Sequence, residues 1–194
     1  MNYRQVIEDA LEERGGVITT EFLAEHNIPT VYLTRLVRSG RLARIGRGVY
    51  ATDRGEYDEL ALFQHRYKKA VFSFETALHL HGLTDKIPQV HHVSVPAHYK
   101  FNARPAGIVV HYVKADLLQL GIARVSTIFG NLVTATNPER TICDIIRHKD
   151  SIEPEMYGQA LRTYAREGDM NRLREMAVVM KMTEKVRTVM EVLL

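Results

Sequence analysis

The chain has 194 residues, of which 45% are hydrophobic and 25% are charged, as is usual for a globular protein of one or two domains. No apolar run approaches the ~20 residues of a membrane-spanning helix, and the acidic residues near the start are not those of a signal peptide: Glu8, Asp9, Glu12 and Glu13. The single cysteine, Cys143, excludes an internal disulfide and a zinc finger of paired cysteines, and it fits a reducing cytoplasm. The net charge of +3 is a mild bias, and its distribution is more informative than its size.

The first part of the chain predicts a helix, a strand and a second helix. Asn2 and Gln5 have the spacing of a capping box, and the helix that they begin ends at Gly15–Gly16. The β-branched segment 17–19 predicts a short strand that adds to a later hairpin. A second helix over 21–26, capped by Thr19 or Thr20, ends in a turn before Pro29, because proline restricts the residue before it.

Residues 30–52 predict a third helix and a hairpin, with five arginines and no Asp or Glu. Thr30 is expected to cap the helix with its hydroxyl, and Gly40 to end it. The inner face carries apolar residues at i, i+3 and i+4 spacing, namely Leu33, Leu36 and Val37. That arrangement leaves four residues on the outer face: Val31, Thr34, Arg35 and Arg38.

The hairpin is expected to pair residues 42–45 with 48–51 around Gly46–Arg47, a two-residue turn with glycine first. Gly46 and Gly48 leave steric room beside Arg47 at the tip. The order of helix, strand, helix, turn, helix and hairpin predicts a winged helix-turn-helix over residues 1–54, which is a DNA-binding fold.

Residues 55–194 predict a mixed α/β domain, so the whole chain is expected to be α+β, with a small sheet and a helical tail. Helices are predicted over 57–69 and 74–81, and Ser73 is expected to cap the second. The predicted strands lie at 92–96, 108–113 and 132–135, with a weaker candidate at 125–129. Asn137-Pro138 predicts the start of a helix that reaches about His148, and three more helices follow Pro154.

Segments along nearly the whole chain resemble the AbiEi family, the antitoxins of bacterial abortive-infection type IV toxin–antitoxin systems. They are the winged helix with its LVRSGRLARIGRGVYA stretch, the helical FSFETALHLHGL segment and, above all, NPERTICDII at 137–146. Many regulators share a winged helix, so that part alone is unspecific. Its pairing with a PERTICD-type segment at this distance is far more specific.

The resemblance implies a bifunctional protein. The sequence itself predicts a cytoplasmic protein with no cofactor and no membrane partner. The N-terminal domain of such an antitoxin binds inverted repeats in its own promoter and represses its operon. The C-terminal domain is needed for both repression and antitoxin activity. The partner is a nucleotidyltransferase-like toxin, whose effect in phage defence the antitoxin opposes without a stable complex.

A winged helix places its third helix in the major groove of double-stranded DNA. Arg35 and Arg38 are then expected to reach guanine edges, and Val31 or Thr34 a thymine methyl. At the tip of the wing, Arg47 is expected to reach phosphates or a narrow minor groove. Three further residues of the segment complete the candidate DNA-binding set: Thr30, Arg41 and Arg44. Arg41 and Arg44 are expected to bind phosphate, which positions the protein without reading sequence, and a solvated or intradomain role is their alternative.

A second acid-poor block runs from Lys86 to Pro138, where Asp116 is the only acidic residue. Four basic residues in it are candidates for a second DNA surface: Lys86, Lys100, Arg104 and Lys114. The alternative is an ordinary sheet with scattered cations. If the block binds duplex DNA, each phosphate neutralised steepens the salt dependence of binding by ~0.9.

The remaining polar residues predict structure rather than chemistry. Arg140 and Asp144 have the i, i+4 spacing of a structural ion pair, and Cys143 between apolar neighbours is expected in the core. Two histidine pairs predict no metal site, because the members of each pair point to different faces: His79 with His81, and His91 with His92.

Two other classes of function stay open beside the antitoxin. A metal-dependent nuclease needs clustered carboxylates, and the strand block offers only Asp116. The chain has no Gly-x-x-x-x-Gly-Lys-[Ser/Thr] loop and no Gly-x-Ser-x-Gly, so no catalytic residue is predicted and a non-enzyme is favoured. A winged-helix regulator without a toxin partner is the other alternative. A nucleotidyltransferase-like gene in the neighbouring reading frame would favour the antitoxin over this regulator.

Overall fold

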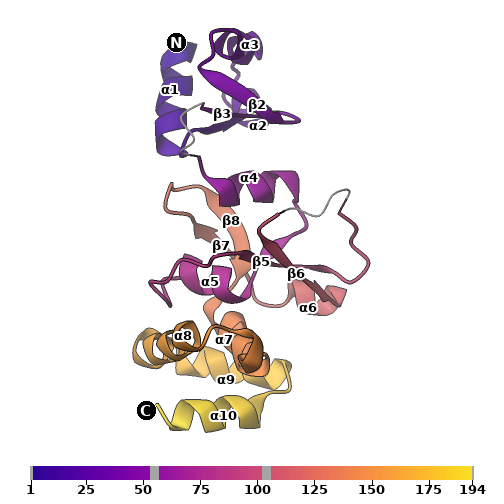
Figure 1. Ribbon diagram of the computed structural model, residues 1–194, viewed down its shortest axis with the longest axis vertical. Coiled ribbons are helices and arrows are strands. Elements are labelled where there is room, and N and C mark those ends of the chain that lie inside the picture. The colour runs from indigo at the N-terminus through magenta and orange to yellow at the C-terminus, as the bar shows by residue number, and fades with distance from the viewer. Residues whose placement is uncertain (1, 53–56, 102–105, 194) are drawn as a thin grey trace. The chain divides into compact units, whose positions relative to one another are not determined.

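The computed structural model describes residues 2–52, 57–101 and 106–193. The chain divides into two compact units, each visible in Figure 1. The first comprises Met1–Lys68 with Ser126–Val133, and the second Lys69–Val125 with Thr134–Leu194. The fold is α+β, as predicted, with helices and a small sheet followed by a second sheet and a helical tail. The predicted domain boundary between residues 54 and 55 lies outside the described residues and stays a prediction.

The first unit has the elements expected of a winged helix-turn-helix. Three antiparallel strands form one sheet in the order β1-β3-β2, so the segment 17–19 joins the hairpin as predicted. The helices and strands of this unit are α1 (Tyr3–Glu13), β1 (Val17–Thr19), α2 (Thr20–Glu25), α3 (Val31–Arg38), β2 (Leu42–Gly46), β3 (Val49–Thr52) and α4 (Glu59–Arg66).

Local caps and a small core hold this unit together. Asn2 accepts a hydrogen bond from the Gln5 amide at 3.4 Å, and Thr19 accepts one from the Phe22 amide at 3.1 Å, so α1 and α2 begin at capped positions. One apolar cluster, which includes the fully buried Ile7, Leu23 and Leu33, joins the three helices to the sheet. The face of α3 that carries Leu33 is thereby fixed inward.

The second sheet has five strands in the order β6-β5-β4-β8-β7. They are β4 (Val71–Phe72), β5 (His91–Pro96), β6 (Ile108–Val113), β7 (Ile122–Ser126) and β8 (Leu132–Thr136). Strands β5 and β6 run parallel, whereas β4 is antiparallel to β5 and parallel to β8. The weaker strand prediction at 125–129 was wrong in position, because β7 ends at Ser126 and Gly130 adopts a left-handed turn conformation at φ 79°.

Helices cover this sheet and continue into the tail. They are α5 (Phe74–Leu80), α6 (Ala115–Gln119), α7 (Pro138–Arg147), α8 (Pro154–Glu167), α9 (Met170–Val179) and α10 (Thr183–Glu191), with a short 3-10 turn at Lys149–Ser151. The predicted start of α7 is confirmed, since Asn137 accepts from the Arg140 amide at 2.8 Å. Ser73 precedes α5 but makes no side-chain cap, because its hydroxyl accepts from Ser94 at 2.9 Å instead.

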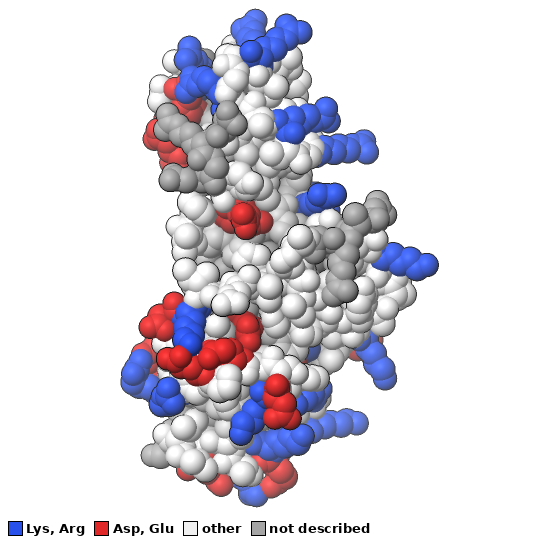
Figure 2. Space-filling model, in the orientation of Figure 1, with Lys and Arg blue, Asp and Glu red and all other residues white. Residues whose placement is uncertain are grey.

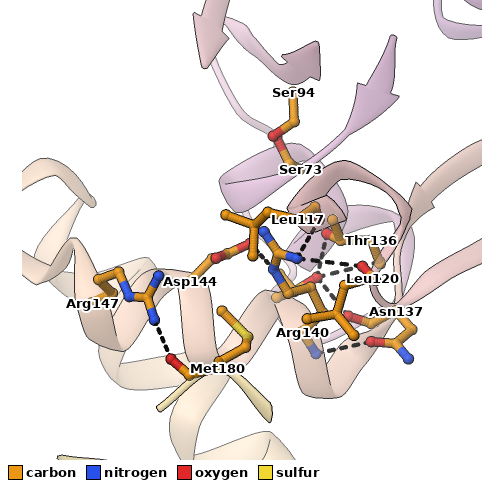
Figure 3. A network of polar contacts seen from close by, with 11 residues as sticks. Ser73, Ser94, Leu117, Leu120, Thr136, Asn137, Arg140, Asp144, Arg147 and Met180 are labelled. Atoms are coloured by element: carbon orange, nitrogen blue, oxygen red, sulfur yellow. Dashed lines mark hydrogen bonds and ion pairs between the residues drawn. The ribbon is translucent and has the colours of Figure 1, made fainter. Parts of the chain in front are cut away.

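A buried ion pair on α7 anchors neighbouring backbone (Figure 3). Arg140 Nε lies 2.7 Å from Asp144 Oδ2, and the two side chains are only 3% and 5% exposed. Arg140 Nη1 also donates to the carbonyls of Leu117 and Leu120 at 2.7 and 3.3 Å. The i, i+4 pair is therefore structural, as predicted, and it fixes the turn between α6 and β7.

Candidate nucleic-acid interface

The third helix separates apolar and basic side chains onto opposite faces. Leu33 is 1% exposed and lies in the core, with Leu36 and Val37 packed against it. The four residues predicted for the outer face are all exposed: Val31, Thr34, Arg35 and Arg38. A side chain on this face meets solvent rather than the body of its own unit.

Thr30 does not cap this helix as predicted. It occupies the N-cap position, but its backbone is helical, at φ −63° and ψ −15°, and its side chain makes no capping hydrogen bond. A capping hydroxyl reaches the free amides from an extended backbone, so the helical conformation removes that geometry. The Thr30 side chain is exposed at the start of α3 and stays a candidate for contact with DNA.

The turn at the tip of the hairpin is shifted by one residue from the prediction. Strands β2 and β3 pair Gly46 with Val49, which leaves Arg47–Gly48 as the two-residue turn. Gly48 has φ +73°, a left-handed conformation that glycine adopts without steric cost, whereas Gly46 does not lie in that region. Glycine therefore comes second in the turn, and Arg47 is exposed at its first position.

Two of the five arginines have partners within the unit. Arg41 Nη1 lies 2.7 Å from Glu8 Oε1, which Arg4 also contacts at 3.0 Å. Hydrogen bonds from Arg4 and Arg41 lower the pKa of the Glu8 carboxyl. Arg44 Nε donates to the Gly46 carbonyl at 3.3 Å, beside the bulge in β2. Arg41 and Arg44 therefore make contacts within their own unit, which is the alternative to DNA binding that the sequence left open for them.

The other three arginines leave their charge on the surface. The Arg35 guanidinium lies 5.5 Å from the centre of the Tyr32 ring, and Arg35, Arg38 and Arg47 make no ion pair with any described residue. Figure 2 shows basic side chains gathered over α3 and the hairpin, and acidic side chains beside α1. The unit thus presents an uncompensated positive surface formed by the helix and the wing.

One residue of the second predicted basic surface, Lys86, is paired with acidic residues of the second unit. Lys86 Nζ lies 3.3 Å from Glu153 and also contacts Glu155, and these contacts raise the pKa of its ammonium group. The charge of Lys86 is thereby compensated. Its partners lie 67 and 69 residues away in the sequence, so a local sequence pattern could not indicate them. Lys100 and Lys114 are exposed, and Arg104 lies outside the described residues.

Sequence reasoning missed a chain of polar contacts in the second unit. His92 Nδ1 lies 3.1 Å from His111 Nε2, and His92 Nε2 lies 3.7 Å from Glu75. Burial, together with the positive charges of His92 and His148, lowers the pKa of His111 to about 4. Among the residues that the structure describes, no group of three or more His, Cys, Asp or Glu is arranged to hold a metal ion.

Cys143 lies in the core, as its apolar neighbours predicted. It is fully buried, and burial raises the pKa of its thiol to about 12. A thiol with that pKa stays protonated at neutral pH, which is the opposite of what a nucleophile needs.

The loop between β7 and β8 also belongs to the first unit, which the sequence did not indicate. Asn131 Nδ2 donates to the Arg14 carbonyl and to Asp58, each at 2.9 Å. Asp58 is 2% exposed, accepts from Thr127 and caps α4 through the Ala61 amide at 2.9 Å. The buried carboxylate therefore fixes the loop against the start of α4, and Asn131 fixes it against the end of α1.

Comparison with known protein families assigns both parts of the chain. A family model described as "AbiEi antitoxin C-terminal domain" matches residues 69–190, and one described as "Transcriptional regulator, AbiEi antitoxin" matches residues 5–52. The chain belongs to the AbiEi antitoxin family. The resemblance to the family is confirmed, and Arg35, Arg38 and Arg47 lie in the part of this AbiEi protein that matches the regulator domain.

Among solved structures, this AbiEi chain is similar to the crystal structure of the RV2827C protein from Mycobacterium tuberculosis. The two share 17% sequence identity at a TM-score of 0.52, over 92% of this chain and 72% of that one. At that identity the similarity concerns the fold alone. No curated protein matches the chain.

Proposed function

We propose that this AbiEi protein is an antitoxin and transcriptional autorepressor that binds inverted repeats in its own promoter. Family membership supports an antitoxin and regulator role in general. The observation that carries DNA binding is the exposed basic face of α3, where Arg35 and Arg38 point away from the buried Leu33. In this proposal α3 enters the major groove, and Arg47 reaches phosphates or the minor groove from the wing.

The arginines have different roles in the proposed complex. Arg35 and Arg38 read base edges, because a guanidinium can bond a guanine in two places. Thr30, Val31 and Thr34 lie on the same exposed surface and contact bases or sugars. Arg44 contributes to phosphate contact at most, since it already bonds to Gly46, and Arg41 must leave Glu8 to reach DNA.

In this proposal the whole chain is needed for antitoxin activity. It opposes the effect of a nucleotidyltransferase-like toxin without forming a stable complex with it. The type IV mode of action and the role in phage defence rest on the family. The protein is proposed to act in the cytoplasm and to have no enzyme activity. Among the described residues, no helix is long and apolar enough to span a bilayer.

A reporter driven by the protein's own promoter tests repression and antitoxin activity together. The wild-type chain should repress the reporter and restore growth to cells that express the neighbouring toxin gene. The double variant R35A/R38A should lose repression. A matched control is R187A, because Arg187 is an exposed arginine on α10 that pairs with Glu184. Repression by R35A/R38A at the wild-type level would contradict the proposal, and repression without rescue of growth would favour a regulator without a toxin partner.

A further inference from the structure

The parallel strands β5 and β6 bring two segments together at one edge of the second sheet. The strands pair in register from His91 with Ile108 to Pro96 with Val113, so their carboxyl ends coincide. Residues 97–101 follow β5, and Lys114 follows β6. Segments at the carboxyl ends of neighbouring parallel strands are a recurrent place for ligands.

This place in the sheet, which we call the aromatic-basic edge, carries three aromatic rings and two lysines: Tyr99, Lys100, Phe101, Tyr112 and Lys114. Tyr112 is 57% exposed on β6, which is one of the two edge strands of the sheet. The rings of Tyr99 and Phe101 meet edge to face, with centroids 4.9 Å apart. The Tyr99 amide donates to the Pro96 carbonyl at 2.8 Å, which turns the chain directly after β5.

The positive charge of the edge is not compensated. Lys100 and Lys114 are exposed, and neither makes an ion pair with a residue that the structure describes. Asp116 is the only acidic residue between Lys86 and Pro138. Lys86 differs, because Glu153 and Glu155 already neutralise it. An anionic partner is therefore expected at the edge and not at Lys86.

We propose that the aromatic-basic edge binds an unpaired nucleic-acid strand. Tyr112 stacks on one base, while Lys100 and Lys114 contact the flanking phosphates. Exposed rings beside cations are the arrangement by which proteins hold single strands, since every base offers a face for stacking. Neighbouring base pairs cover that face in a duplex, so an exposed tyrosine distinguishes unpaired from paired nucleotides. The site is separate from α3 and does not depend on operator binding.

Fluorescence anisotropy of the full-length chain tests this site directly. The probes are labelled 12-nucleotide oligothymidylate and oligouridylate, which separate single-stranded DNA from RNA as the source of the strand. Y112A should weaken binding of the preferred strand roughly tenfold, as expected for loss of one stacked base, whereas Y112F should bind like wild type. K100A and K114A should each reduce the salt slope by about 0.7.

Two controls make the result specific to the edge. K86A should bind both oligomers like wild type, because the charge of Lys86 is already paired. R35A/R38A should keep single-strand binding even if it loses the promoter duplex, so failure of one proposal is distinguishable from failure of the other. The proposal is overturned if neither oligomer binds, or if K100A, K114A and Y112A all bind as tightly as wild type. Lys100 and Lys114 are exposed, so their variants decide the matter even if Y112A does not fold.

Discussion

The guanidinium of Arg41 lies 2.7 Å from the carboxylate of Glu8, although 33 residues separate them in the sequence. Arg41 is therefore held within the first unit by an ion pair, although it belongs to the same run of five arginines as the exposed Arg38. Arg38, three residues earlier and at the end of α3, has no such partner among the described residues. The two positions therefore give different expectations for binding to DNA.

R38A is expected to weaken binding to the promoter duplex by about 1–3 kcal/mol, the value of one bidentate base contact. R41A should change it much less, because Arg41 must first leave Glu8. Electrophoretic mobility shifts at one salt concentration compare the two variants. An equal loss in R41A and R38A would show that the contact with Glu8 does not hold in the complex.

Replacement of Gly48 should destabilise the wing, whereas replacement of Gly46 should not. Gly48 has φ +73°, and a Cβ there would lie 2.6 Å from Thr20 Oγ1. G48A is expected to cost about 1–2 kcal/mol from the left-handed backbone alone. The control G46A meets only Val49 atoms at 3.8 Å, an ordinary contact. Urea denaturation measures the stability of both variants. A larger loss of stability in G46A would contradict this expectation and favour Gly46–Arg47 as the turn, as predicted from the sequence.

Replacing only one partner of the buried Arg140–Asp144 ion pair on α7 should destabilise the protein. R140M leaves the Asp144 carboxylate without its partner and frees the carbonyls of Leu117 and Leu120. A loss of roughly 3–5 kcal/mol is expected, as for other buried ion pairs. R140M/D144L should recover much of that loss in urea denaturation. As a control, R187M removes an exposed pair and should change stability by less than about 1 kcal/mol.

The histidine contacts predict that stability depends on pH in a defined window. Burial lowers the pKa of His111 to about 4, from about 6.5 in an unfolded chain. Between these values the unfolded state binds more protons, so the free energy of unfolding falls as pH decreases from about 6.5 to about 4. H111Q should flatten this dependence. Denaturation curves from pH 4.5 to 7.5 test it, and parallel profiles for wild type and H111Q would contradict the assignment to His111.

The sequence predicts most of the elements because they follow local rules. Periodic apolar residues locate the long helices, and Asn2, Thr19 and Asn137 mark helix starts that the structure confirms as capped. β4 has two residues and α6 has five, which is too few for a period to be visible. The turn of the wing was misplaced by one residue, because Gly-Arg-Gly allows either glycine to take the left-handed position.

Pairing partners were not predictable from local pattern. Lys86 meets Glu153 and Glu155 at separations of 67 and 69 residues, and only the fold brings them together. The same holds for Asp58 with Asn131, and for His92 with His111. Sequence reasoning therefore identified which arginines α3 exposes, but not which basic residues elsewhere are already compensated.

Footprinting of the upstream promoter with the full-length chain tests the central claim most directly. The wild-type chain should protect the inverted repeats, and R35A, R38A and R47A should each reduce that protection, since these arginines form the uncompensated surface of α3 and the wing. Protection unchanged in all three variants would contradict the account.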